Sequence, residues 1–316
     1  MTQKMLARFG KHLSFMRLQV CVRWERKYKY RGNDVKMIDK EQIQKQMIQV
    51  VETVKQTNPM AGSITNSVTI NLVANAQLAV GGSAAMVYLP DEGEFLAKAG
   101  GATYINVGTL FPIYEETLPR TVKALQEAGK PWVLDPVAIG IGELRTKLLF
   151  QFKKYKPSVI RGNASEVIAL AGLWNLAGGV TQSNVRGVDS TDSVLAAKDA
   201  AVALAKWTGG AVAVSGETDL ITDGSMIAVA HGGSHFFEKI TGAGCSLGGV
   251  VAVYLSAASP FIAALTAAAV YNLAGQRAEH KVDGPGHFQT QFLDELYKAT
   301  GKEIADTLFE LEEVTV

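Results

Sequence analysis

Residues 102–137, ATYINVGTLFPIYEETLPRTVKALQEAGKPWVLDPV, contain the pattern that decides the fold class. The apolar run at 102–107 predicts a buried strand, and residues 114–128 have the apolar spacing of a helix. A second apolar run, 132–137, predicts another buried strand. Two strands joined by a helix are typical of a parallel sheet, so the segment predicts an α/β protein.

The alternation of helices and strands continues on both sides of this segment. A helix is expected at 39–55 and a polar turn at 62–67. Further helices are predicted at 68–80, 165–171, 193–207, 247–257, 261–280 and 288–298. Further strands are predicted at 84–89, 158–161, 211–214, 220–222 and 226–230, the last two as a hairpin. The pattern predicts a three-layer α/β/α fold with a mainly parallel central sheet.

Composition argues against several classes of protein. The formal net charge of +1 argues against a protein that binds nucleic acid, since such proteins carry a basic excess. The most apolar region, 250–270, is interrupted by Ser259-Pro260, and we expect two buried helices there and no membrane span. The two cysteines, Cys21 and Cys245, make no disulfide framework, which favours a reducing, cytoplasmic location.

Residues 1–38 are rich in Lys and Arg and hold only Glu25 and Asp34 as acids. Three explanations are open: a disordered tail, a targeting leader, or translated residues upstream of a true start at Met37. We expect this basic extension to lie outside a single domain at 39–316, because no repeat or linker divides the later residues.

The glycine-rich turn Thr241-Gly242-Ala243-Gly244-Cys245-Ser246 precedes the apolar run VVAVYLS at 250–256. Its small residues leave the backbone bare, and a helix beginning here directs free N–H groups and a positive dipole end outward. This arrangement favours a phosphoryl group or another anion. The structural alternative is a tight helix entry with a buried, inert thiol at Cys245.

Polar residues follow several of the predicted strands. In open parallel sheets, ligands bind beyond the carboxyl ends of the strands. We therefore expect Asp135, Arg161, Glu166 and Ser215 to meet the turn at 242–245 on one edge. Two carboxylates with phosphate oxygens suit a hydrated Mg²⁺. Alternatively, Asp135 only begins a loop and Glu166 is a favourable charge in the first turn of its helix.

Several stretches together resemble the hydroxyethylthiazole kinases, in the order and spacing of that family. They are SITNSVTINLVANAQLAVGGSAAM (63–86), WVLDPV (132–137), IRGNASE (160–166), SGETDLITDG (215–224), TGAGCSLGGVV (241–251) and DGPGHFQ (283–289). The resemblance covers about residues 40–316 and implies the ribokinase-like fold. Most ribokinase-like proteins carry an aspartate at the position of Cys245, and a cysteine there is typical of the thiazole kinases.

The resemblance implies transfer of the ATP γ-phosphate to the alcohol of 4-methyl-5-(2-hydroxyethyl)thiazole, a salvage step that feeds thiamine synthesis. It also implies Mg²⁺ as cofactor, and a homotrimer with thiazole sites between subunits. By position, the implied catalytic residues are Gly242, Ala243, Gly244 and Cys245. The implied thiazole-binding residues are Met86, Asn66, Gly81 and Gly242. Arg161 and Ser215 would bind ATP, and Asp135 and Glu166 would lie near the metal.

Cys245 would stand beside the attacking alcohol. We expect the helix N-terminus to lower the pKa of its thiol, so that Cys245 helps to orient and deprotonate the alcohol without being essential.

The chain departs from the family pattern at a few positions. Gly62 replaces a histidine, Ala84 a proline, Ser215 a threonine, and Ala138-Ile139-Gly140 a glycine-rich stretch after Asp-Pro-Val. Two alternatives follow: another ribokinase-like enzyme, such as an ATP-dependent nucleotide-hydrate dehydratase or a pyrimidine kinase, and a binder that lost activity. Cys245 argues against the first, and the retained turn with its charged residues argues against the second.

Overall fold

The computed structural model describes residues 40–180 and 193–314. The expectations for residues 1–38, with Cys21 and Met37, lie outside the described residues.

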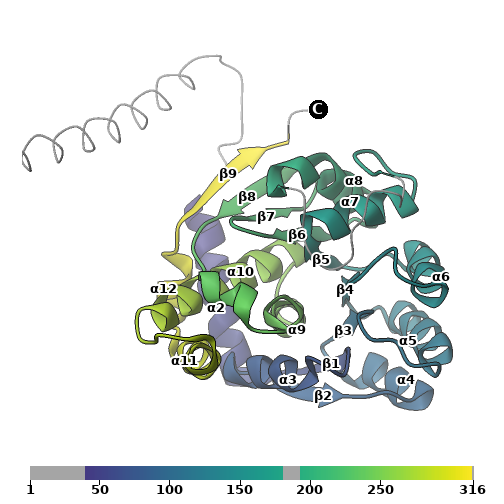
Figure 1. Cartoon of the computed structure of the whole chain (residues 1–316), viewed down its shortest axis with the longest axis horizontal. Coiled ribbons are helices and arrows are strands. Elements are labelled where there is room, and N and C mark those ends of the chain that lie inside the picture. The colour runs from purple at the N-terminus through teal and green to yellow at the C-terminus, as the bar shows by residue number, and fades with distance from the viewer. Residues whose placement is uncertain (1–39, 181–192, 315–316) are drawn as a thin grey trace, which may run out of the picture. The chain divides into compact units, whose positions relative to one another are not determined.

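The described strands form one nine-stranded sheet in the order β2-β1-β3-β4-β5-β6-β7-β8-β9 (Figure 1). Neighbouring strands are parallel from β2 to β6 and antiparallel from β6 to β9. The strands are β1 (Met60–Ile64), β2 (Ser83–Met86), β3 (Ala102–Asn106), β4 (Trp132–Asp135), β5 (Val159–Asn163), β6 (Ala211–Ser215), β7 (Asp219–Thr222), β8 (Met226–Ala230) and β9 (Phe309–Glu313).

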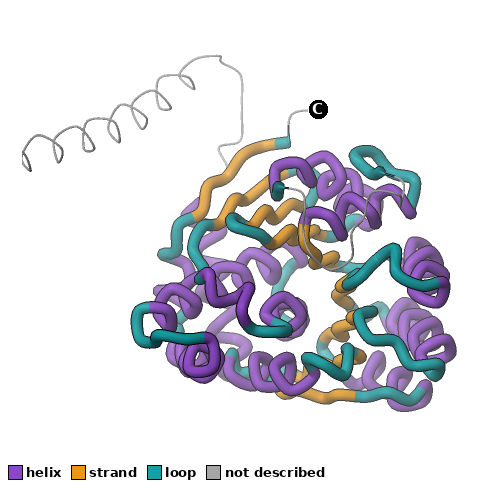
Figure 2. Tube along the Cα trace, in the orientation of Figure 1, coloured by secondary structure: helices purple, strands orange, loops and turns teal. Residues whose placement is uncertain are grey.

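Helices cover both faces of the sheet, as the tube view shows (Figure 2). One face carries α4 (Pro90–Ala99), α5 (Tyr114–Ala128), α6 (Glu143–Phe152), α7 (Ala164–Leu173) and α8 (Lys198–Thr208). The other carries α2 (Lys40–Thr57), α3 (Ile70–Ala79), α9 (Ala243–Leu255), α10 (Pro260–Glu279), α11 (Pro285–Lys298) and α12 (Gly301–Ala305). The predicted three-layer, mainly parallel architecture is confirmed.

The central strands are apolar because helices cover both of their faces. Every residue of β3 and β4 is buried. The register places Asn106 beside Asp135 and Asn163 beside Ser215, each at the carboxyl end of its strand. The chemistry-bearing residues therefore gather at one edge of the sheet.

The polar turn predicted at 62–67 is wrong in its first half, since Gly62, Ser63 and Ile64 lie in β1. At Gly62 the Leu96 side chain of α4 packs close to the bare backbone, since a Cβ there would lie 2.8 Å from Leu96 Cδ1. The elements α4, α6, α12 and β9 were not predicted.

The described residues contain no helix long and apolar enough to cross a membrane. Pro260 is the first residue of α10, so the most apolar region divides into α9 and α10 as expected.

The first and last described elements lie together. Lys40, which begins α2, donates from Nζ to the Phe309 carbonyl at 2.6 Å, and the same ammonium lies 4.3 Å from the Phe309 ring centre. β9 pairs antiparallel with β8 and closes that end of the sheet.

Candidate functional site

The glycine-rich turn is the start of α9, which begins at Ala243 and not at the predicted residue 247. Gly242 is the N-cap residue, with φ of +91°, and no side chain caps the helix. A Cβ at Gly242 would lie 2.7 Å from Thr69 Cγ2. The first intrahelical bond runs from the Ser246 amide to the Gly242 carbonyl at 2.8 Å, so the amides of Ala243, Gly244 and Cys245 precede the ladder. A bare, positive helix end of this kind suits an anion.

A cavity of about 410 Å³ opens in front of this turn. Gly242, Gly244 and Cys245 line it from α9, and Arg161 and Glu166 line it from the β5–α7 region. The remaining lining residues are Asn66, Val68, Thr69, Gly108, Thr109, Val137, Ala138, Asn163 and Thr241. The turn at 242–245 and the strand ends therefore lie together at one cavity, as predicted.

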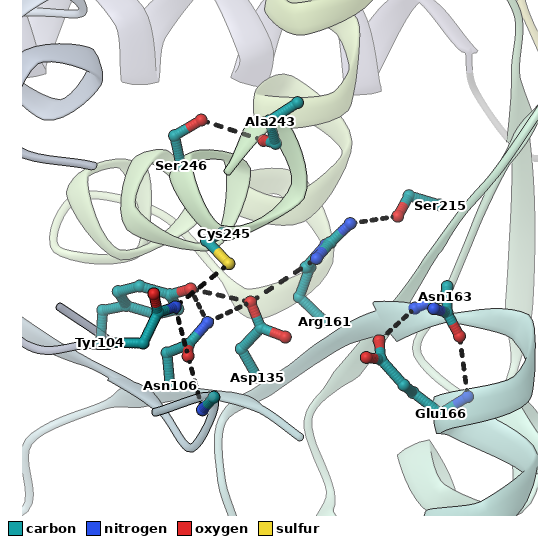
Figure 3. A network of polar contacts seen from close by, with 12 residues as sticks. Tyr104, Asn106, Asp135, Arg161, Asn163, Glu166, Ser215, Ala243, Cys245 and Ser246 are labelled. Carbon is teal, nitrogen blue, oxygen red and sulfur yellow. Dashed lines mark hydrogen bonds and ion pairs between the residues drawn. The ribbon is translucent and has the colours of Figure 1, made fainter. Parts of the chain in front are cut away.

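Arg161 places a positive charge under the helix start. Its side chain is 9% exposed, and Nη1 lies 3.5 Å from Asp135 Oδ2 while Nη2 donates to the Ser215 hydroxyl (Figure 3). A Cβ at Gly244 would lie 2.5 Å from Nη2 and 2.6 Å from Nη1. The bare Gly244 is therefore what allows the guanidinium to reach this place.

Asp135 is fully buried at the end of β4. Its Oδ2 accepts hydrogen bonds from the Tyr104 hydroxyl at 2.7 Å and from Asn106 Nδ2 at 3.1 Å. Its Oδ1 is buried and has no partner among the described residues. Burial raises the pKa of Asp135, and this effect outweighs the opposing attraction of Arg161.

Glu166 caps α7 and borders the cavity at once. Its Oε2 accepts from the Asn163 amide at 2.9 Å, while Asn163 Oδ1 accepts from the Glu166 amide at 2.9 Å, which is a capping box. Burial and the Asp135 carboxylate raise the pKa of Glu166 to about 7. Glu166 therefore stabilises the first turn of α7, as the structural alternative expects, and it also lines the cavity.

Cys245 lies beside Asn66, whose Nδ2 is 3.5 Å from the Cys245 sulfur. The expected lowering of its pKa is wrong: burial, followed by the nearby Asp135 carboxylate, raises the pKa of the thiol. These effects outweigh the helix end because the sulfur is desolvated. The thiol is therefore protonated at neutral pH and is no general base as it stands.

Replacing Cys245 by serine is expected to lower kcat by no more than about 10-fold, which is less than the roughly 100-fold or more that a positioned proton acceptor contributes. A serine hydroxyl accepts the Asn66 hydrogen bond and keeps the same proton on the side chain. Steady-state kcat with saturating substrates tests this. A loss above about 100-fold would show that the sulfur itself takes part in proton transfer.

The remaining implied thiazole residues lie in two places. Asn66 is buried at the cavity, and Met86 ends β2, the edge strand, where it pairs with Ser63 of β1. Gly81 precedes β2 at the opposite, amino end, where its carbonyl accepts from Asn58 Nδ2 at 2.9 Å. A Cβ at Gly81 would meet Lys55. The described chain thus does not bring Gly81 to the other site residues.

Ala138 lines the cavity with φ of +60°, a left-handed conformation that costs an L-residue about 1–2 kcal/mol. Glycine at this position in the family is explained by that angle. Replacing Ala138 by glycine is expected to raise stability by about 0.5–1 kcal/mol after the added entropy of the unfolded chain. The melting temperature should rise by about 1–4 °C.

Calorimetry of Ala138→Gly tests this, with Ala128→Gly as the matched control. Ala128 is exposed at the end of α5 and helical, so glycine there should lower stability by about 1 kcal/mol. Equal changes in both variants would contradict the strain at Ala138.

The described residues contain no group of three His, Cys, Asp or Glu side chains placed to hold a metal ion. Mg²⁺ needs no such cage, because one or two carboxylates with phosphate oxygens and waters complete its shell. The partnerless Asp135 Oδ1 and the neighbouring Glu166 carboxylate fit that donor set.

Sequence reasoning missed Tyr104 and Asn106, which hydrogen bond to Asp135. Both lie inside the apolar run 102–107, and only the register of β3 with β4 distinguishes them from ordinary strand residues. Their spacing of two, which places both on one face of the strand, was the available signal.

Comparison with known proteins adds independent findings. The model of the hydroxyethylthiazole kinase family matches residues 51–302. A hydroxyethylthiazole kinase of Bifidobacterium longum (strain DJO10A) is 49% identical over 283 residues, covering 84% of this chain and 90% of the relative. A hydroxyethylthiazole kinase structure from Pyrococcus horikoshii OT3 has a TM-score of 0.76 at 27% identity, covering 86% and 100% of the two chains. A ribokinase-like protein from Enterococcus faecalis V583 has a TM-score of 0.57 at 13% identity, covering 86% and 100%, and shares the fold.

Proposed function

The chain belongs to the hydroxyethylthiazole kinase family, and from this we propose that it transfers the γ-phosphoryl group of ATP to the hydroxyethyl alcohol of 4-methyl-5-(2-hydroxyethyl)thiazole, a step of thiamine salvage. The observation that carries the proposal is the bare start of α9 above the Arg161 guanidinium, at a cavity that Cys245 also lines.

Phosphoryl transfer has a loose transition state, so positioning and charge neutralisation supply most of the catalysis. The amides of Ala243, Gly244 and Cys245, at a helix start that no side chain caps, are proposed to donate to the phosphoryl oxygens. Arg161, held by Asp135 and Ser215, adds a fixed positive charge that needs no rearrangement during the reaction. Gly242 lines the cavity at the same turn, where the alcohol is proposed to lie.

Asp135 and Glu166 are proposed to hold Mg²⁺ together with the nucleotide phosphates. Bound there, Mg²⁺ neutralises phosphate charge. Cys245 is protonated, so its proposed role is to orient the alcohol beside the turn. Ser215, at the end of β6, is proposed to contact ATP alongside Arg161.

A homotrimer is proposed to complete the thiazole site at Met86. The carboxyl ends of β1, β2 and β3 present large apolar side chains to solvent: Val68 is 65% exposed, Leu89 49% and Phe111 41%. Apolar surface around a partly open site is typical of a subunit interface. Light scattering should give three times the mass of the chain.

The cytoplasm is the proposed location, and residues 39–316 are the proposed catalytic domain.

The test is ATP consumption by the purified chain with Mg²⁺ and hydroxyethylthiazole, compared with pyrimidine alcohols and nucleotide hydrates. We expect turnover with the thiazole alcohol and at least about 100-fold lower kcat/KM with the others. Preference for a pyrimidine alcohol or a nucleotide hydrate would show another ribokinase-like enzyme. Tight thiazole binding without turnover would show a binder.

A further inference from the structure

Tyr104 and Asn106 are two buried side chains of β3 that the proposed mechanism leaves without a role. They are two residues apart and therefore lie on the same face of the strand. Both hydrogen bond to Asp135 of the neighbouring strand, and Asn106 Nδ2 also donates to the Tyr104 hydroxyl at 2.9 Å (Figure 3). Polar groups buried together in this way restrict each other's orientation.

The orientation of the Asn106 amide is set by its surroundings. Its Oδ1 accepts from the Gly108 backbone N–H at 2.9 Å, and a backbone N–H only donates. Oδ1 also accepts from Asn66 Nδ2 at 3.0 Å, and the Asn66 amide is fixed in turn because its own Oδ1 accepts from the Thr69 backbone N–H at 3.1 Å. The NH₂ group of Asn106 is therefore directed at Asp135.

The donors around Asp135 all meet one of its two oxygens. Tyr104, Asn106 and Arg161 each approach Oδ2, at 2.7, 3.1 and 3.5 Å respectively. Oδ1 is buried without a partner among the described residues, and Figure 3 shows it turned away from Tyr104 and Asn106. A carboxylate held in this way has one oxygen committed to its donors and one buried oxygen that still lacks a donor.

The packing of α9 leaves space for the Tyr104 ring. Gly248 faces that ring, and a Cβ at Gly248 would overlap its Cε2 atom. Glycine is unfavourable inside a helix by about 1 kcal/mol, so its place here is explained by the approach of Tyr104.

We propose that Tyr104 and Asn106 are positioning residues that hold Asp135 through Oδ2 and so present Oδ1 to the divalent cation. The proposal rests on the proposed kinase function and deepens it. Hydrogen-bond partners of metal-binding carboxylates orient them, and their loss commonly costs 10- to 100-fold in metal affinity. Asn106 additionally connects Asp135 to Asn66, beside Cys245, so it acts on both ends of the site.

The test measures Mn²⁺ binding by electron paramagnetic resonance, with the non-hydrolysable analogue AMP-PCP and no thiazole. Tyr104→Phe removes one donor and keeps the ring, and it should weaken Mn²⁺ binding about 10-fold. Its KM for hydroxyethylthiazole should stay within about twofold of the parent value. Asn106→Ala should weaken Mn²⁺ binding about as much and also raise the thiazole KM, because Asn66 loses its partner.

Tyr254→Phe is the matched control, since Tyr254 is equally buried but lies near the far end of α9. It should leave Mn²⁺ affinity unchanged. Unchanged Mn²⁺ affinity in Tyr104→Phe, or an equal loss in Tyr254→Phe, would overturn the proposal. If Tyr104→Phe does not fold, Asn106→Ala carries the same measurement.

The two proposals fail in different ways. A parent chain that binds Mn²⁺ with AMP-PCP but does not phosphorylate hydroxyethylthiazole would overturn only the kinase function. A chain that phosphorylates the thiazole, and whose variants bind Mn²⁺ as tightly as the parent, would overturn only the positioning role.

Discussion

Replacing Gly244 by valine is expected to lower kcat by about 100- to 1,000-fold, the range found when a fixed transition-state donor is removed. A Cβ at Gly244 would lie 2.5 Å from Arg161 Nη2, and valine adds two further methyl groups there. The guanidinium must move away from Ser215 and Asp135, or the start of α9 must shift. Either change misplaces the donors that face the phosphoryl group.

Steady-state kinetics with varied ATP and thiazole alcohol test this. Gly286→Ala is the control, because a Cβ at Gly286 meets nothing within 4 Å, and it should retain full activity. Gly244→Val should also lose far more activity than Cys245→Ser. The reverse order would make the thiol, and not the anion-binding turn, the main catalytic group.

Replacing Asp135 by asparagine is expected to lower kcat by about 1,000-fold while raising stability at neutral pH. Activity falls because the carboxylate oxygen that lacks a donor and its charge are lost. Stability rises because the pKa of Asp135 is raised by burial despite Arg161, so the ionised carboxylate is a net cost to the fold, while Glu166 and Ser215 remain as partners of the Arg161 guanidinium. Activity and stability therefore change in opposite directions.

The sign of the pH dependence follows from the same shift. The ordinary pKa is 3.8, and below it the side chain is protonated in the folded and unfolded chains alike, so its ionisation costs nothing. As the pH rises through the folded pKa, the carboxylate ionises and the fold loses stability. The melting temperature of Asp135→Asn should therefore exceed that of the parent at pH 7, by about 2–4 °C per kcal/mol, and match it near pH 4.

Asp294→Asn is the control for this comparison, since Asp294 is exposed on α11. Its melting temperature should follow the parent at every pH. An Asp135→Asn variant that is less stable than the parent at pH 7 would mean that the Arg161 ion pair outweighs the cost of burying the carboxylate.

The sequence predicts most of this fold because its helices and buried strands have clear periods. The helix predicted at 114–128 has the same bounds as α5. The apolar spacing of α2 places Ile43, Met47 and Val54 in the core. β1 was missed because Gly62 and Ser63 have the composition of a turn. Only the pairing with β2 and β3 shows that these residues belong to a strand.

The candidate site was predictable as far as the carboxyl ends of parallel strands determine it. Asp135, Arg161, Glu166 and Ser215 were expected at one edge, and the structure places them there. The raised pKa of Cys245 was not predictable, because it depends on the desolvation of the half-buried thiol and on the nearby buried carboxylate of Asp135. Tyr104 was missed for a similar reason, since its contact with Asp135 depends on the register between β3 and β4.

The contact between Lys40 and Phe309 has a consequence for how the protein is made. These residues are 269 positions apart. The first described element to emerge during synthesis, α2, therefore cannot form its contact with Phe309 until nearly the whole chain has been made. β8 also presents an open edge until residues 309–313 arrive to pair with it. Once β9 has paired, its exposed glutamates Glu310, Glu312 and Glu313 protect the new edge of the sheet, whereas an unpaired β8 favours pairing with other chains. The nascent protein is therefore expected to be more prone to aggregation before β9 is in place.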